Sequence, residues 1–167
     1  MNRQRHTIDE QGTLDAGVEL ASHLSGGTVI ALEGPLGAGK TCLARGIAIG
    51  LGVDARSVAS PTFAILHEHP VGIPGELRRL YHIDAYRLSG SEDLESIGWS
   101  ELVEDQAGVV LVEWATRISP ALPDDVWRID VSYDSERGRL MQLCVGGNAN
   151  VAAGIWDEPE ESVAGGG

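Results

Sequence analysis

Apolar positions recur with helical periodicity in two segments of the first third of the chain. In the first segment, the residues three or four positions apart are Leu14, Val18, Ala21 and Leu24. Because this spacing places them on one face, it predicts a helix over residues 10–24, with Asp9 as its N-cap. In the second segment, the corresponding residues are Leu43, Ile47 and Leu51. They predict a helix over residues 41–51, which the glycines near its end would terminate.

Short apolar runs, which are typical of buried strands, separate and follow these helices. They predict strands over residues 6–8, 28–32, 62–67, 77–83 and 109–113. Two later segments, 126–133 and 139–145, alternate apolar and polar positions, and residues 134–138 between them are polar or glycine. We therefore expect a C-terminal antiparallel hairpin that forms an edge of the sheet.

A third helix is expected over residues 91–105. Ser91 provides a side-chain oxygen that can cap its N-terminus. Asp93 and Glu95 place negative charge in the first turn, where the helix dipole favours it. Since strands and helices alternate along the chain, the whole pattern indicates an α/β protein.

Length and composition fit one globular domain followed by a tail. A single hydrophobic core usually serves roughly 100 to 200 residues, and this chain has 167. We expect residues 1–145 to form that domain. Residues 146–167 are rich in Gly, Ala, Asp and Glu, a composition that buries too little apolar surface to order itself. We therefore expect a flexible, acidic, glycine-rich tail in which Trp156 docks transiently.

Hydropathy and charge limit where in the cell the protein is expected and which partners it is expected to bind. No apolar stretch approaches the roughly 18 to 20 residues that span a bilayer, and residues 1–10 lack the apolar centre of a secretory signal. We therefore expect a cytoplasmic protein with no membrane contact. The formal net charge of −13 opposes binding to a phosphate backbone. Any contact with nucleic acid should accordingly be indirect or limited to a local basic patch.

The octapeptide GPLGAGKT at residues 34–41 is the strongest chemical signal in the sequence. It satisfies the pattern G-x-x-x-x-G-K-[ST] and lies between a predicted strand and a predicted helix, the context that a P-loop needs. Glycines let backbone N–H groups converge on phosphate oxygens, Lys40 reaches the β- and γ-phosphates, and the Thr41 hydroxyl binds magnesium. The residues expected to bind nucleotide here are Leu36, Gly37, Ala38, Gly39, Lys40, Thr41 and Cys42.

Lysine usage supports this assignment, because Lys40 is the only lysine among the 12 lysine and arginine residues. A compact ammonium and an arginine fork are not interchangeable in a phosphate cradle. The guanine-reading motif of GTPases needs another lysine beyond the P-loop, so adenine is the expected base. We expect ATP or ADP, with Mg²⁺, as the ligands.

Phosphoryl transfer also needs carboxylates that hold the metal or orient the nucleophile. One apolar run ends at Glu113, like a Walker B strand with Glu in place of the commoner Asp, and an earlier run ends at Asp84. The sequence alone does not rank these two residues. Thr62, in the turn SPTF at residues 60–63, is a candidate switch that responds to the γ-phosphate. The alternative is a proline turn with Phe63 packed in the core.

Several separated motifs resemble those of one family. They are DEQGTL at residues 9–14, the loop at 34–41, SPTF at 60–63, HIDAYR at 82–87 and Glu113-Trp114. In this order, over roughly residues 8–114, they resemble the TsaE (YjeE-type) ATPases, which take part in forming the threonylcarbamoyladenosine modification beside the anticodon of tRNA. Cys42 is a mild departure, since the family often has Thr at that position.

The resemblance implies a P-loop NTPase fold with three α/β/α layers around a mixed, mainly parallel sheet. It also implies an ATPase that depends on magnesium and is slow until partners activate it. Those partners would be the TsaB and TsaD proteins, and hydrolysis would reset their complex between modification cycles. Contact with tRNA would be indirect.

The same resemblance implies roles for individual residues. They are the metal ligands Thr41 and Glu113, the hydrolytic residues Asp84 and Lys40, the switch residue Thr62 and the nucleotide neighbour Thr13. Trp114 lies directly after Glu113. It should therefore report nucleotide binding through its fluorescence.

Two other functions are consistent with a P-loop in a chain of this size. A small-molecule kinase usually places several arginines in a mobile lid, and the nearby arginines here are Arg78, Arg79 and Arg87. A non-catalytic nucleotide sensor would instead switch partners through Thr62. Phosphate transfer to an added metabolite would indicate the kinase, whereas full biological activity of an Asp84→Ala variant would indicate the sensor.

Overall fold

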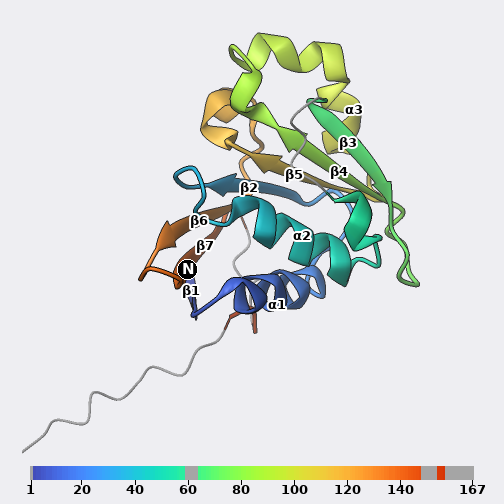
Figure 1. Ribbon diagram of the computed structural model, residues 1–167. Helices are drawn as coiled ribbons and strands as arrows, with labels where there is room; N and C mark the ends of the chain where they lie inside the picture. Colours follow the sequence, from blue (N-terminus) through green and yellow to red (C-terminus); the bar gives the residue numbers. More distant parts are fainter. Residues whose placement is uncertain (1, 59–63, 148–153, 157–167) are drawn as a thin grey trace, which may run out of the picture.

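A computed structural model describes residues 2–58, 64–147 and 154–156, which form a seven-stranded sheet with helices against both faces (Figure 1). The strands are β1 (Asn2–Thr7), β2 (Val29–Glu33), β3 (Leu66–Pro70), β4 (Arg79–Asp84), β5 (Gly108–Glu113), β6 (Trp127–Tyr133) and β7 (Arg139–Val145). The α-helices are α1 (Glu10–Ala21), α2 (Lys40–Gly50) and α3 (Trp99–Glu104). Short 3₁₀ segments are η1 (Ala55–Ser57), η2 (Ala85–Arg87), η3 (Ser91–Ile97) and η4 (Ala115–Ala121). The expected three-layer α/β/α architecture is confirmed.

The order of the strands in the sheet is β1-β7-β6-β2-β5-β4-β3. The four central strands, β6, β2, β5 and β4, run parallel, and antiparallel pairs flank them on both sides. The expected mixed sheet is therefore confirmed. The carboxyl ends of β2, β4 and β5 meet at one edge, where Glu33, Asp84 and Glu113 lie. Open α/β sheets bind their ligands at such an edge.

The hairpin of β6 and β7 forms as expected, but its predicted place at the edge of the sheet is wrong. Strand β6 pairs in parallel with β2, and β7 is covered by the antiparallel strand β1. A strand was expected only over residues 6–8, because Asn2, Arg3, Gln4 and Arg5 give no alternating apolar pattern. An edge strand with so little buried apolar surface cannot be recognised from its periodicity.

Helices α1 and α2 pack together on one face of the sheet, and η3, α3 and η4 cover the other (Figure 1). The contact between α1 and α2 depends on glycine. A Cβ atom added to Gly17 would lie 2.6 Å from the carbonyl oxygen of Leu43, and one added to Gly46 would overlap the carbonyl oxygen of Leu14. The two helices therefore approach more closely than larger residues allow, which places the first turn of α1 beside the start of α2.

The helix expected over residues 91–105 is wrong as one element. The chain forms η3 and then α3, and it turns between them at Gly98, whose φ of 73° is in the left-handed region. Ser91 does not cap a helix, because it is itself the first residue of η3. The N-cap position belongs to Gly90, which has no side chain that could cap the element. The Asp93 carboxylate accepts a hydrogen bond from the backbone N–H of Ser89 at 2.8 Å.

Two other elements have bounds that differ from the expected ones by three residues or more. Helix α1 ends at Ala21 because the Ser22 hydroxyl and N–H both donate to the carbonyl of Glu19, which tightens the last turn. Leu24 still packs against the core from outside the helix. Strand β3 begins at Leu66, later than the strand expected over residues 62–67, and residues 59–63 lie outside the described part of the chain.

The C-terminal region contributes a buried tryptophan. The Trp156 side chain is 1% exposed, and its indole N–H donates to the carbonyl oxygen of Ala16 in α1 at 3.1 Å. The neighbouring Ile155 is fully buried in the same core. The expected flexible tail otherwise falls on residues 148–153 and 157–167, which lie outside the described residues. Among the helices of the described residues, none has the length and apolar character needed to cross a membrane.

Candidate functional site

The glycine-rich loop after β2 stands at the carboxyl edge of the parallel strands and leads directly into α2. Its glycines have left-handed backbones: φ is 142° at Gly34, 77° at Gly37 and 107° at Gly39. Other residues rarely adopt these angles. A Cβ atom at Gly34 would also overlap the carbonyl oxygen of Val131. The motif therefore requires glycine because of the course of the backbone, and this course turns the loop around the N-terminus of α2.

Lys40 is buried at the centre of this loop. Its ammonium group donates to the carbonyl oxygens of Gly34 at 2.6 Å and Pro35 at 3.0 Å, and it lies 3.9 Å from the centre of the Trp114 ring. Burial lowers the pKa of Lys40, and the charges of Glu113, Glu33 and Asp84 partly oppose this shift. Phosphate oxygens accept stronger hydrogen bonds than peptide carbonyls do, so a nucleotide at this site would attract the same ammonium.

Thr41 and Glu113 meet across the interface between α2 and β5. The Thr41 hydroxyl donates to Oε1 of Glu113 at 2.8 Å, and Glu113 is only 2% exposed. Asp84 stands opposite Glu113 in the register of β4 and β5 but is half-buried. Its carboxylate accepts the backbone N–H of Tyr86 at 3.0 Å and caps η2. The two carboxylates thus occupy different settings, one enclosed beside Thr41 and one at the mouth of the site.

His82 is a site residue that sequence reasoning did not single out. Its Nε2 atom lies 2.9 Å from Oε2 of Glu113, and the His82 side chain is 1% exposed. A signal existed in the sequence, because His82 precedes Asp84 by two positions on a predicted strand. Residues at that spacing face the same side of a sheet.

A hollow of about 400 Å³ opens between the loop, the end of β4 and the end of β5. Its lining residues are Leu36, Gly37, Gly39, Lys40, Thr41, Cys42, Asp84, Tyr86, Arg87, Glu113 and Trp114. The structure therefore brings together most of the residues that the sequence predicts. The side chain of Ala38 faces the core instead, so this residue offers only its backbone to a ligand. Thr62 lies outside the described residues.

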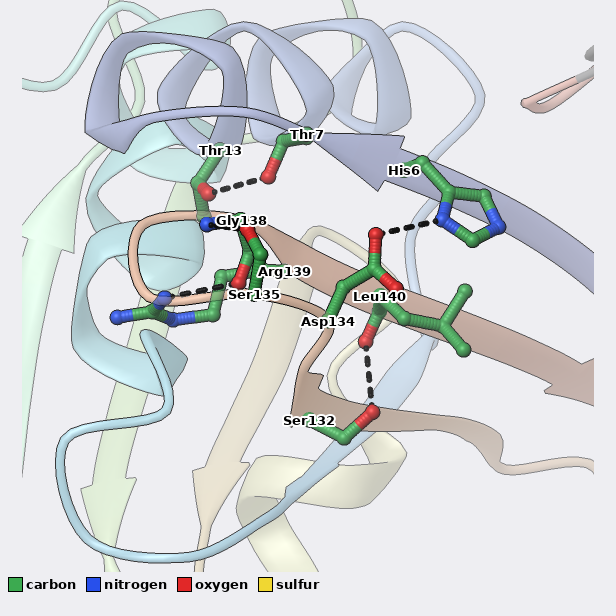
Figure 2. Close-up of polar contacts among 9 residues, drawn as sticks. All are labelled: His6, Thr7, Thr13, Ser132, Asp134, Ser135, Gly138, Arg139 and Leu140. Atoms are coloured by element: carbon green, nitrogen blue, oxygen red, sulfur yellow. Dashed lines mark hydrogen bonds and ion pairs between the residues drawn. The ribbon is translucent and has the colours of Figure 1, made fainter.

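A smaller hollow of about 220 Å³ lies on the other side of the loop and contains Thr13. The buried Thr13 hydroxyl is 3.0 Å from that of Thr7, which ties the first turn of α1 to the end of β1 (Figure 2). Gly39, Cys42 and Arg139 line the same hollow. Thr13 is thus close to the loop, and it lines a different hollow from Glu113 and Asp84.

The tip of the β6–β7 hairpin holds the loop from outside. The Tyr133 hydroxyl donates to the carbonyl of Leu36 at 3.0 Å, and Nε of Arg139 donates to the carbonyl of Ala38 at 2.8 Å. In a trans peptide the C=O and the following N–H point in opposite directions. These contacts therefore turn the N–H groups of Gly37 and Gly39 away from the hairpin. Sequence reasoning did not anticipate this arrangement.

The hairpin tip is itself fixed by polar contacts (Figure 2). The Ser135 hydroxyl accepts the backbone N–H of Gly138 at 2.9 Å, and Arg139 donates to the Gly138 carbonyl at 2.9 Å. His6 of β1 lies 3.1 Å from the Asp134 carboxylate. The edge strand β1 and the hairpin thus form one support beneath the loop.

The arginines considered for a kinase lid do not gather at the site. Arg79 is the first residue of β4, at the opposite end from Asp84, and pairs with Asp105 at 2.9 Å. Arg87 lies in η2 beyond the other end of β4 and lines the larger hollow. Since β4 separates Arg79 from Arg87, these two arginines do not form the cluster that a kinase lid would need.

Comparisons with known proteins agree with this geometry. Residues 7–141 match the family described as "Threonylcarbamoyl adenosine biosynthesis protein TsaE". Relatives named "tRNA threonylcarbamoyladenosine biosynthesis protein TsaE" include one from Nostoc sp., 38% identical over 81% of each chain, and one from Bacillus subtilis, 37% identical over 85% of each chain. The crystal structure of YdiB from Bacillus subtilis superposes with a TM-score of 0.67 and 30% identity, covering 89% of this chain and 88% of that one.

Proposed function

This chain belongs to the TsaE family, and on that basis we propose that it binds and hydrolyses ATP with magnesium during threonylcarbamoyladenosine biosynthesis on tRNA. In this proposal it works with the TsaB and TsaD proteins, and its contact with tRNA is indirect. The net charge of −13 supports that last point, because it opposes direct binding to a nucleic-acid backbone.

The observation that supports ATP chemistry most directly is the contact between Thr41 and Glu113. A hydroxyl from the start of α2 and a carboxylate from the end of β5 lie 2.8 Å apart, beside the Lys40 ammonium. Mg²⁺ prefers oxygen ligands and is usually held by one or two protein groups together with phosphates and water. These two oxygens fit that requirement, so Thr41 and Glu113 would hold the ion. When bound, magnesium would neutralise part of the phosphate charge.

The loop supplies the groups that bind phosphate. Backbone N–H groups of Gly37, Ala38 and Gly39 would contact its oxygens, and Lys40 would exchange the carbonyls of Gly34 and Pro35 for phosphate. The nucleoside would extend past Cys42 towards the smaller hollow that Thr13 and Arg139 line. In this arrangement the γ-phosphate faces the larger hollow.

Asp84 is the residue we assign to hydrolysis. It lines the larger hollow and is half-buried, so it can accept a hydrogen bond from a water molecule. A carboxylate in this position would orient the attacking water towards the γ-phosphate. Thr62 remains the proposed switch residue, which would respond to that phosphate.

The test measures phosphate release from ATP and Mg²⁺ by the chain alone and with TsaB and TsaD. We expect slow release alone and strong stimulation by the pair. An Asp84→Ala variant should bind nucleotide but release little phosphate. The control is Asp124→Ala, because Asp124 is exposed and precedes β6 at the opposite edge of the sheet.

Three outcomes would contradict the proposal. Phosphate attached to an added metabolite would indicate a kinase. Normal tRNA modification by Asp84→Ala would indicate a nucleotide sensor whose function does not need hydrolysis. Nucleotide binding without any stimulation by TsaB and TsaD would contradict the proposed partners.

A further inference from the structure

The carboxylate of Glu113 is held on both of its oxygens by different elements. Oε1 accepts from Thr41 of α2 at 2.8 Å, and Oε2 lies 2.9 Å from Nε2 of His82 in β4. His82 pairs with Leu111 in the register of β4 and β5, so Glu113 is its diagonal neighbour two positions further along. The side chains of His82 and Glu113 are 1% and 3% exposed, so they depend on protein groups for these hydrogen bonds.

The direction of this hydrogen bond follows from the chemistry of the acceptor. An ionised carboxylate can only accept, so Nε2 of His82 is the nitrogen that donates the hydrogen. A buried carboxylate without donors would be strongly destabilised. His82 therefore satisfies Oε2 and also fixes the plane of the carboxylate.

The two contacts differ in what a bound metal would do to them. In the proposed function the Thr41 hydroxyl oxygen and Oε1 both face magnesium, so the ion would bind on the side of the carboxylate where their contact lies. The contact between His82 and Oε2 lies on the other side of the carboxylate and can persist. His82 would then be the group that keeps Oε1 directed at the metal.

The ring of His82 is restrained by its neighbours. His67 of β3 lies directly opposite it in the antiparallel register of β3 and β4. His69, two positions further along β3, is 6% exposed and stacks on His67 with ring centres 6.2 Å apart. Its burial and its hydrogen bond to Glu113 leave the His82 ring little freedom, as positioning requires.

We propose that His82 is a positioning residue for magnesium, acting by orienting the carboxylate of Glu113. This inference rests on the proposed function, since it assumes that Thr41 and Glu113 hold the ion. Groups that orient metal ligands in this way typically change metal affinity by about 10- to 100-fold when they are removed. The effect should therefore appear in the magnesium requirement for nucleotide binding.

The experiment compares His82→Asn with His82→Gln. The shorter amide of asparagine stops near the Nδ1 position and cannot reach Oε2, whereas the glutamine amide extends to the position of Nε2. Binding of a non-hydrolysable ATP analogue is measured by calorimetry across a range of MgCl₂ concentrations. We expect His82→Asn to raise the magnesium midpoint by about 10-fold or more. His82→Gln should restore most of the wild-type midpoint, and metal-free affinity should change little in either variant.

The matched control is His23→Asn, the same change at a half-buried histidine that follows α1 and lines neither hollow. Its magnesium midpoint should equal that of the wild type. A second test combines His82→Asn with Glu113→Gln. Since His82 acts through Glu113, it should add no further effect in that background, and an additive effect would overturn the inference.

The failure of this inference is distinguishable from the failure of the proposed function. If the wild type binds the analogue without any dependence on magnesium, the proposed metal site is wrong. If the wild type depends on magnesium but folded His82→Asn has the same midpoint, His82 does not position the ligand. A fall in metal-free affinity as large as the fall with magnesium would show a general structural role and equally overturn the proposal.

Discussion

The ammonium group of Lys40 lies 3.9 Å from the centre of the Trp114 indole ring. This contact depends on the turn after β5, where Trp114 has a φ of 59° and its N–H donates to the carbonyl of Leu32 at 3.1 Å. A left-handed backbone is uncommon for a tryptophan. It places the ring over the lysine, where the two attract through a cation–π interaction. The tryptophan therefore lies against the group that would move when phosphate binds.

The first prediction is that nucleotide binding changes the fluorescence of Trp114. Phosphate would draw the Lys40 ammonium away from the ring and from the carbonyls of Gly34 and Pro35. Titrating the protein with ADP or ATP, with emission recorded on excitation near the indole band, should give a saturable change. The same titration with Lys40→Ala should show binding weakened by about 10-fold or more, because a buried phosphate would lose its charged partner.

The control replaces Trp114 with phenylalanine, which keeps an aromatic ring over Lys40. The remaining tryptophans are Trp99, Trp127 and Trp156, and none of them lines the larger hollow. Trp114→Phe should therefore bind nucleotide but lose the fluorescence change. A full change in this variant would mean that the signal arises elsewhere in the molecule.

The second prediction concerns the support that the hairpin gives to the loop. Removing the Tyr133 hydroxyl with Tyr133→Phe leaves the Leu36 carbonyl without its donor. We expect nucleotide binding to weaken by about 5- to 10-fold, which corresponds to about 1 kcal/mol, as for one lost hydrogen bond. Calorimetric titration with ADP measures this. Ser132→Ala is the control, because Ser132 bonds within the hairpin to Leu140 and not to the loop (Figure 2). Equal weakening in both variants would contradict a specific role for Tyr133.

The central residues of the site could be predicted from the sequence because local rules determine their positions. Gly34, Gly37 and Gly39 have backbone angles that favour glycine, so the motif reports the loop conformation directly. Asp84 and Glu113 end buried parallel strands, and such strand ends meet at one edge of a sheet. Pattern and geometry agree at these positions because the conformation depends on neighbours in the chain.

The supporting contacts could not be predicted, because they join distant segments. Tyr133 bonds to Leu36 from 97 positions away, and no local pattern marks that pair. The division of residues 91–105 at Gly98 and the pairing of polar β1 with β7 also depend on tertiary packing. The different settings of Glu113 and Asp84 could not be predicted either, since the contact that encloses Glu113 comes from Thr41, 72 positions away.

The third prediction is that Trp156 stabilises the domain although it follows a segment of tail-like composition. Its ring is buried against α1 and its indole N–H donates to the carbonyl of Ala16. Trp156→Ala should lower the free energy of unfolding by about 3 to 5 kcal/mol, as for a large aromatic side chain removed from a core. Trp156→Phe should lose about 1 kcal/mol, mainly the hydrogen bond. Urea unfolding measures both values, and a loss below about 1 kcal/mol for Trp156→Ala would contradict its place in the core.

The fourth prediction is a pH dependence of stability at the end of the domain opposite the hollow. Hydrogen bonds from Arg79 at 2.9 Å and Tyr81 at 2.7 Å, with a further one from the Ala107 N–H, lower the pKa of Asp105 from 3.8 to about 2. A carboxylate whose pKa is lower in the folded state stabilises the fold above its ordinary pKa. This stabilisation is lost as pH falls from about 4 towards 2, because the unfolded chain then binds the proton more readily.

Asp105→Asn should therefore be less stable than the wild type at pH 7, by about 1 to 2 kcal/mol for hydrogen bonds to a charged group at a partly exposed site. The difference should shrink between pH 4 and pH 2, where the wild-type carboxylate becomes protonated. Urea unfolding of both proteins at several pH values measures this difference. Glu104→Gln is the control, since Glu104 is an exposed neighbour on α3. A difference between Asp105→Asn and the wild type that stays constant down to pH 2 would show that the ionised carboxylate is not its source.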